Sequence, residues 1–233
     1  MSLFLRVKMI NRFEFRGCLK SNPNEEDFAV AIAKTENSIN KEILAGQVLE
    51  ACIYRCKDML FFYIESLSET VAPDLITSEL TPFMELWPEE KGLTPWAYMY
   101  PVYYQSIPKT EEDWIKERVP GKTKVGRIAF LKHDTMFEYV YWHKAIVDEG
   151  LLKGDKYQFI SLHEDILFSY YEEPRTQVNI SGAEGESEAI KGWLAIDPGA
   201  HFDLTKTGGS HFMNIKPLLI VEKSSVLSTL TIE

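Results

Sequence analysis

The sequence lacks three features that define common classes of protein. It has only three cysteines, an odd number without a tight framework, so we do not expect a secreted disulfide scaffold. Its longest apolar stretches, such as residues 59–64, are far shorter than the roughly 20 residues that cross a membrane as a helix. It has little positive charge, with 25 basic against 35 acidic residues. Because an acidic surface repels phosphate groups, we expect neither a nucleic-acid nor a membrane partner.

The N-terminal residues also lack the sustained apolar core of a secretory signal, so we expect a cytoplasmic protein. The chain is nevertheless 45% hydrophobic, which excludes disorder as the main state. Cys52 and Cys56 lie four residues apart in a strand-like run, on one face of that strand. The same half contains no second Cys/His pair. We therefore interpret them as buried thiols, with redox chemistry or metal binding as the alternative.

A repeated motif indicates that the chain is duplicated. Residues 58–65 read DMLFFYIE and residues 165–172 read DILFSYYE, which are identical at five of eight positions. Each copy follows another β-rich run, so each pair is interpreted as a β-hairpin. The same elements surround both hairpins in the same order. A strand at residues 12–20 or 126–134 and then a helix precede the hairpin. A helix containing Trp87 or Trp193 and a proline-bearing strand at residues 101–104 or 217–221 follow it.

Each copy therefore predicts the order strand, helix, strand, strand, helix, strand, which is the ferredoxin-like motif of an α+β protein. Because such a sheet leaves one face bare, we expect the two halves to form an α+β barrel of the dimeric type within one chain. The predicted organisation is a structural half at residues 1–105, a charged linker with a short helix at residues 106–123, and a site-bearing half at residues 124–233. The alternative is one larger α+β domain.

Histidine is confined to the second half, which contains all five. This distribution indicates that the second copy has specialised. His133 ends a strand next to the expected mouth of a pocket. His163, His201 and His211 show no HxH or HExxH spacing, so we expect no metal site.

The helix that follows Thr135 carries the most informative pattern. Thr135 and Glu138 predict a capping box at its start, and Gly150 or Gly154 can end it. Tyr139 and His143 are then one turn apart on the same face. A phenol and an imidazole so placed can transfer protons near neutral pH. The alternative is that both are ordinary packing residues of an amphipathic helix.

The stretch EYVYWHKAI at residues 138–146, followed by YQFISLHEDILFSYYE, resembles the L-rhamnose mutarotase family over about forty residues. The resemblance implies a ferredoxin-like fold and a sugar pocket in which Tyr139 and His143 take the family's tyrosine and histidine positions. The first half shares the pattern of elements but not the motif, since its corresponding helix has neither residue. We expect Phe28 and Ile32 to fill the equivalent region there.

The resemblance implies a mutarotase-like isomerase that interconverts the anomers of a reducing monosaccharide by acid–base catalysis, with no cofactor. His143 and Tyr139 would be catalytic, and Trp193, Tyr170 and His133 would bind the substrate, the aromatic rings by stacking on the sugar. The alternative is a non-catalytic small-ligand-binding or monooxygenase-like α+β barrel protein. The sequence leaves open whether the chain is active and whether it is a monomer or a homodimer.

Overall fold

The computed structural model describes residues 9–90, 92–108, 110–119, 121–150, 155–175 and 187–230. The chain divides into two compact units. The first unit comprises residues 1–98, 108–120 and 217–233, and the second comprises residues 99–107 and 121–216. Two strands, β6 (Ala97–Tyr104) and β10 (Met213–Glu222), begin in one unit and end in the other. The boundaries predicted from the sequence delimit repeats rather than compact units, and they stay a prediction.

The strands are hydrogen-bonded in the cyclic order β1-β3-β2-β10-β7-β9-β8-β6, a closed barrel. The other six strands of the barrel are β1 (Asn11–Cys18), β2 (Val48–Cys56), β3 (Met59–Ser66), β7 (Thr123–Phe130), β8 (Phe159–His163) and β9 (Ile166–Glu173). The first repeat contributes β1, β2, β3 and β6, and the second contributes β7, β8, β9 and β10. If the strands of each repeat are numbered 1 to 4 along the chain, their order in the barrel is 4-1-3-2 in both repeats. This order confirms the predicted α+β fold of two ferredoxin-like halves in one barrel.

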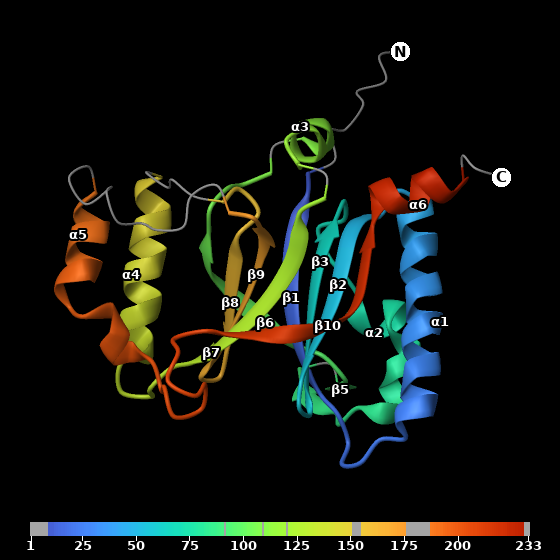
Figure 1. Cartoon of the computed structure of the whole chain (residues 1–233), viewed down its shortest axis with the longest axis horizontal. Helices are drawn as coiled ribbons and strands as arrows, with labels where there is room; N and C mark the ends of the chain where they lie inside the picture. The colour runs from blue at the N-terminus through green and yellow to red at the C-terminus, as the bar shows by residue number, and fades with distance from the viewer. Residues whose placement is uncertain are drawn as a thin grey trace. The chain divides into compact units, whose positions relative to one another are not determined.

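In the first unit, helix α1 (Glu25–Leu44) packs on the sheet of β1, β3 and β2 (Figure 1). The helix begins at Asn24, whose side chain accepts hydrogen bonds from the backbone N–H groups of Glu26 and Asp27. Its apolar face and the facing strand residues form one hydrophobic core. Phe28 is buried in this core and Ile32 packs against it, as the sequence predicts.

The prediction of a second long helix in the first repeat is wrong. In its place are two short helical segments, α2 (Pro73–Ile76) and the 3-10 helix η1 (Ser78–Phe83), followed by a hairpin of β4 (Trp87–Glu89) and β5 (Gly92–Thr94). Trp87 therefore lies on a strand. The physical reason is the density of prolines in this region, because Pro82 and Pro88 offer no backbone N–H for an α-helix. Gly92 adopts a φ of +132° and allows the hairpin to turn.

The predicted short helix in the linker is present as α3 (Glu111–Lys116), which belongs to the first unit. Trp114 is buried, and Arg118 follows the helix. The Arg118 guanidinium forms ion pairs with Glu50 at 2.8 Å and with Glu65 at 2.7 Å. Both carboxylates are fully buried. This segment is therefore anchored to its unit by one aromatic ring and one pair of charge-assisted contacts.

In the second unit, helices α4 (Met136–Glu149) and α5 (Glu188–Ala195) lie side by side (Figure 1). Gly192 of α5 faces Trp142 of α4 so closely that a Cβ atom would lie 2.2 Å from the indole. The Glu149 carboxylate accepts hydrogen bonds from the Ser187 hydroxyl and from the Ala189 N–H at the start of α5. These contacts fix the two helices against each other. The 3-10 helix η2 (Pro198–His201) follows.

The start of α4 corrects one detail of the sequence analysis. Thr135 is the N-cap residue, as predicted, but its side chain makes no capping hydrogen bond. Glu138 lies 3.2 Å from His201 Nε2, so its carboxylate is engaged by another element. The predicted capping box is therefore not formed. The helix ends at Gly150 with a φ of +67°, one of the two predicted ends; the other, Gly154, lies outside the described residues.

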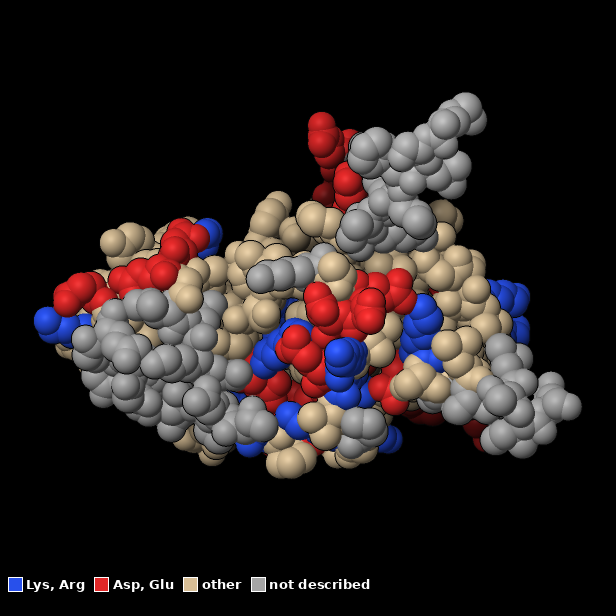
Figure 2. Space-filling model, turned by 90° about the horizontal axis from the view of Figure 1, so that it is seen from above, with Lys and Arg blue, Asp and Glu red and all other residues tan. Residues whose placement is uncertain are grey.

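Helix α6 (Lys223–Leu230) follows β10 and contacts α1 in the first unit. Within the described part of the chain, no helix is both long and apolar enough to cross a membrane. Figure 2 shows acidic and basic side chains intermingled at the centre of one face. No extended basic area is visible on that face.

Candidate functional site

Tyr139 and His143 form a stacked pair on α4. Their ring centroids are 3.8 Å apart and the rings are inclined by 20°. His143 Nδ1 lies 2.9 Å from the Tyr139 carbonyl oxygen, which assigns the proton to Nδ1 in the neutral ring. Burial lowers the pKa of His143 to about 4 and raises the pKa of Tyr139. At neutral pH the imidazole is therefore uncharged and the phenol is protonated.

Aromatic rings surround this pair. Trp193 of α5 has its centroid 4.8 Å from that of His143 and 5.5 Å from that of Tyr139. Tyr103 approaches His143 edge-on at 5.8 Å. His143 retains only 6% of its exposed area. The structure therefore brings together three of the residues predicted from the sequence, His143, Tyr139 and Trp193, within the core between helix and sheet.

His201 belongs to the same cluster, although the sequence analysis gave it no role. Its ring lies 4.9 Å from Trp193, and it is 1% exposed. Its Nε2 atom faces Glu138, whereas Nδ1 is buried with no hydrogen-bond partner among the described residues. No spacing in the sequence relates His201 to α4, because their contact depends on how η2 packs against the helix.

The other two predicted ligand-binding residues lie elsewhere. Tyr170 is fully buried on β9, and its hydroxyl donates a hydrogen bond to Glu172 at 3.1 Å. Since side chains alternate along a strand, Tyr170 faces the side of the sheet opposite to Leu167, which packs with the helices. The side chain of His133 is 85% exposed and lies 3.8 Å from Asp165. Neither residue joins the Tyr139–His143 pair.

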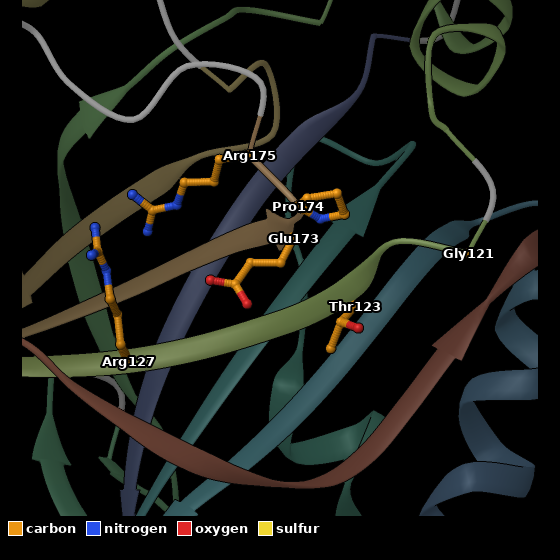
Figure 3. A pocket seen from close by; sticks show the side chains of 6 residues that line it. All are labelled: Gly121, Thr123, Arg127, Glu173, Pro174 and Arg175. Carbon is orange, nitrogen blue, oxygen red and sulfur yellow. The ribbon is translucent and has the colours of Figure 1, made fainter.

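A cavity of about 710 Å³ opens in the second unit where β7 begins and β9 ends (Figure 3). Six residues line it, namely Gly121, Thr123, Arg127, Glu173, Pro174 and Arg175. β7 and β9 pair antiparallel, with Thr123 opposite Glu173. This register places polar side chains at the adjoining ends of both strands. The volume falls within the range of small-ligand pockets.

Two guanidinium groups face this cavity and share one aromatic ring. Arg175 lies 3.6 Å from the centroid of Tyr171, and Arg127 lies 4.8 Å from the same centroid. Arg127 also stacks on Phe212 at 4.1 Å and donates from Nε to the Ser169 hydroxyl at 3.3 Å. Figure 3 shows the two guanidinium ends side by side. The rings orient the cations and shield them from water on one side.

Within the described residues, neither of the two arginines at this cavity, Arg127 and Arg175, forms an ion pair with a carboxylate. Burial, followed by the charge of Arg175, lowers the pKa of Arg127 to about 10, so it remains protonated at neutral pH. Glu173 lines the same cavity, and its carboxylate accepts a hydrogen bond from the Tyr171 hydroxyl at 3.3 Å.

The cavity and the stacked pair on α4 are neighbours. The charge of Arg127 acts on Tyr139, where it opposes the rise in pKa that burial causes. Phe202 contacts Tyr139 at 5.7 Å on one side and Phe212 at 5.7 Å on the other. A continuous row of rings thus leads from His143 to Arg127. Alternation along β7 holds the signal that reveals Arg127, because it shares a strand face with the core residue Ala129.

No set of three His, Cys, Asp or Glu side chains in the described residues could hold a metal ion. Tyr139 stacks on one face of the His143 ring, and Trp193 and Tyr103 contact the ring in edge-to-face geometry. The cavity lined by Arg127 and Arg175, which we call the arginine pocket, presents charged and hydroxyl side chains instead.

No known family profile matches the sequence, and a search of curated proteins finds no match. Solved structures are similar at low identity. A Lactobacillus acidophilus protein proposed to be a monooxygenase is 9% identical, with 92% of this chain and 97% of that chain covered and a TM-score of 0.42. A mutant chlorite dismutase from Candidatus Nitrospira defluvii is 11% identical, with 97% of each chain covered and a TM-score of 0.37. A haem-binding protein from Thermus thermophilus is 15% identical, with 97% of this chain and 98% of that chain covered and a TM-score of 0.35.

These likenesses are too weak to assign a ligand or a reaction to this chain. They do not support the mutarotase predicted from the sequence.

Proposed function

We propose that this chain is a binding protein for a small organic anion, held in the second unit between Arg127 and Arg175. The observation that carries the proposal is the pair of guanidinium groups on one tyrosine ring at a cavity of about 710 Å³. Guanidinium is a planar fork of donors that matches a carboxylate or phosphate group.

An unpaired charge that is buried destabilises a protein. Withdrawing a charged group from water without a counter-ion costs several kcal/mol, and pairing with an opposite charge offsets this cost. Arg127 is partly buried between Tyr171 and Phe212, with another cation beside it, in a protein whose formal net charge is −10. Since neither arginine at the cavity forms an ion pair among the described residues, the entry of an anion would stabilise both charges. The bound anion supplies the missing counter-charge.

The test is calorimetric titration of the full chain with acetate, benzoate and inorganic phosphate at low ionic strength. We expect binding of one equivalent of at least one of these anions, and affinity that falls as salt is added. Arg127→Met should weaken binding by about 10- to 100-fold, the value of a hydrogen bond to a charged group.

Lys216→Gln is the matched control. It removes one positive charge from an exposed side chain of the same unit and should leave the affinity unchanged. If none of the three anions binds, or if Lys216→Gln weakens binding as much as Arg127→Met, the proposal is wrong.

The mutarotase predicted from the sequence is a second candidate, favoured by one observation, the stacking of Tyr139 and His143 at 3.8 Å. Acid–base catalysis by this pair predicts that the chain accelerates anomer exchange of a reducing sugar. Saturation-transfer NMR with rhamnose, fucose, galactose and glucose measures this rate. His143→Ala should slow it by about 10²- to 10⁴-fold. A wild-type rate equal to the uncatalysed rate for all four sugars would eliminate the candidate.

A further inference from the structure

The arginine pocket contains a negative group as well as two positive ones. Glu173 lines the cavity beside Arg175 in the sequence and shares Tyr171 with it, since the tyrosine hydroxyl donates to Glu173 Oε1 at 3.3 Å. Figure 3 shows the Glu173 carboxylate and the two guanidinium ends as separate groups at one cavity. The Glu173 carboxylate raises the pKa of Arg127 through space, so the two charges are close enough to interact.

Despite this proximity, the opposite charges do not neutralise each other. Among the described residues, Glu173 forms no ion pair with either Arg127 or Arg175. The Tyr171 hydroxyl holds the carboxylate, and the Tyr171 ring holds the guanidinium groups. One aromatic side chain thus keeps both signs of charge apart at the cavity. The Thr123 hydroxyl, opposite Glu173 in the sheet register, adds a neutral polar group.

We infer that the ligand is a zwitterion of the amino-acid type, whose carboxylate binds Arg127 and Arg175 while its ammonium group binds Glu173. This inference rests on the proposed anion-binding function and names the class of anion. A pocket that separates two cations from one anion is complementary to a molecule that carries both charges on two groups attached to one carbon atom. A hydroxyl group in the place of the ammonium can donate one hydrogen bond to Glu173 but brings no charge.

Three probes of similar size separate these cases. Alanine carries a carboxylate and an ammonium group, lactate carries a carboxylate and a hydroxyl group, and propionate carries the carboxylate alone. NMR titration of the full chain should give affinities in the order alanine, lactate, propionate. Because Glu173 is exposed, we expect steps of about 2- to 5-fold, the range of an exposed ion pair.

Glu173→Gln is the decisive variant, since it predicts changes of opposite sign. Loss of the negative charge should weaken alanine binding by about 2- to 5-fold and leave propionate binding unchanged or tighter, because like-charge repulsion is removed. A variant that merely damaged the pocket would weaken all probes together. Glu188→Gln, which removes an exposed carboxylate at the start of α5, serves as the control and should change neither affinity.

The outcomes distinguish the two proposals. If propionate, lactate and alanine bind equally, or if Glu173→Gln weakens alanine and propionate alike, the inferred ligand class is wrong while anion binding stands. If none of the probes, nor phosphate or benzoate, binds the full chain, both proposals fall.

Discussion

One arginine site in each unit shows a contrast in how the positive charge is surrounded. In the first unit, Arg118 is 12% exposed in its side chain and forms ion pairs with two fully buried carboxylates, Glu50 and Glu65. In the second unit, Arg127 and Arg175 stack on Tyr171 at a cavity and form no ion pair among the described residues. A cation that is fully compensated within the fold stabilises the fold. A cation left uncompensated at a cavity is available to a ligand.

The same contrast holds for the surroundings of these groups. Burial opposes ionisation of Glu65, but the charge and hydrogen bonds of Arg118, with further hydrogen bonds, keep its pKa below the ordinary value. Around Arg127, burial and the charge of Arg175 both disfavour the cation and lower its pKa to about 10. Buried carboxylates therefore compensate the charge of Arg118, whereas the charges of Arg127 and Arg175 have no ion-pair partner among the described residues.

Arg118→Met should destabilise the protein most, by about 3–5 kcal/mol at neutral pH, because it leaves Glu50 and Glu65 buried without their cation. The deficit should shrink toward pH 5, since carboxylates that lose their cation take up protons more readily. Urea unfolding at both pH values measures it. The control is Lys116→Met on the exposed side of α3. Equal stability of the two variants would contradict a structural role for Arg118.

Arg127→Met should have the opposite signature. Anion binding should weaken by about 10- to 100-fold. The free energy of unfolding should stay unchanged or rise by on the order of 1 kcal/mol, because an uncompensated cation is removed from a partly buried site. Calorimetric titration and urea unfolding of the same preparation provide both values. A loss of stability as large as that of Arg118→Met would erase the distinction between the two units.

His143 should make the stability of the fold depend on pH. Burial lowers the pKa of His143 in the folded protein to about 4, below its ordinary value of 6.5, so the unfolded chain binds the proton first as pH falls. Stability should be full above about pH 6.5 and decline toward pH 4, by about 2 kcal/mol between pH 7.5 and pH 5. His143→Gln should remove this decline, whereas His133→Gln, an exposed position, should retain it. A slope unaffected by His143→Gln would show that the imidazole is not buried in neutral form.

The smallest expected difference is between the starts of the first helix of each repeat. Asn24 caps α1 with two hydrogen bonds, and Thr135 caps α4 with none from its side chain. Asn24→Ala should cost about 1 kcal/mol, and Thr135→Ala less than about 0.5 kcal/mol. Thermal unfolding compares the two variants. A larger cost at Thr135 would mean that the capping box predicted from the sequence forms in solution.

The fold could be predicted from the sequence because the chain repeats one order of elements. The apolar run of the hairpin strand recurs at residues 58–65 and 165–172, and the same strand and helix signals flank both copies. The helix predicted around Trp87 is wrong. It was inferred from the matching order of elements in the two repeats, and the prolines of this region remove backbone donors that a helix needs.

The site could be predicted only in part. The one-turn spacing of Tyr139 and His143 gave their stacking correctly, because it depends on helix geometry alone. Arg127 and Arg175 lie close together because of the register of β7 against β9. The contact of Arg127 with Phe212 depends on the path of a loop. Such tertiary contacts have no local signature. An arginine on the core face of a strand was the one signal available in the sequence.

The arginine pair of the second unit is the proposed binding site for an anionic ligand. NMR of arginine side chains, in which the Nε–Hε signals are followed as alanine and benzoate are added to the full chain, reports on this site. We predict that the signals of Arg127 and Arg175 shift with saturation, while those of Arg118 and Arg55, which already have carboxylate partners, stay in place. Signals of Arg127 and Arg175 that do not move, or that move no more than those of Arg55, would contradict the account.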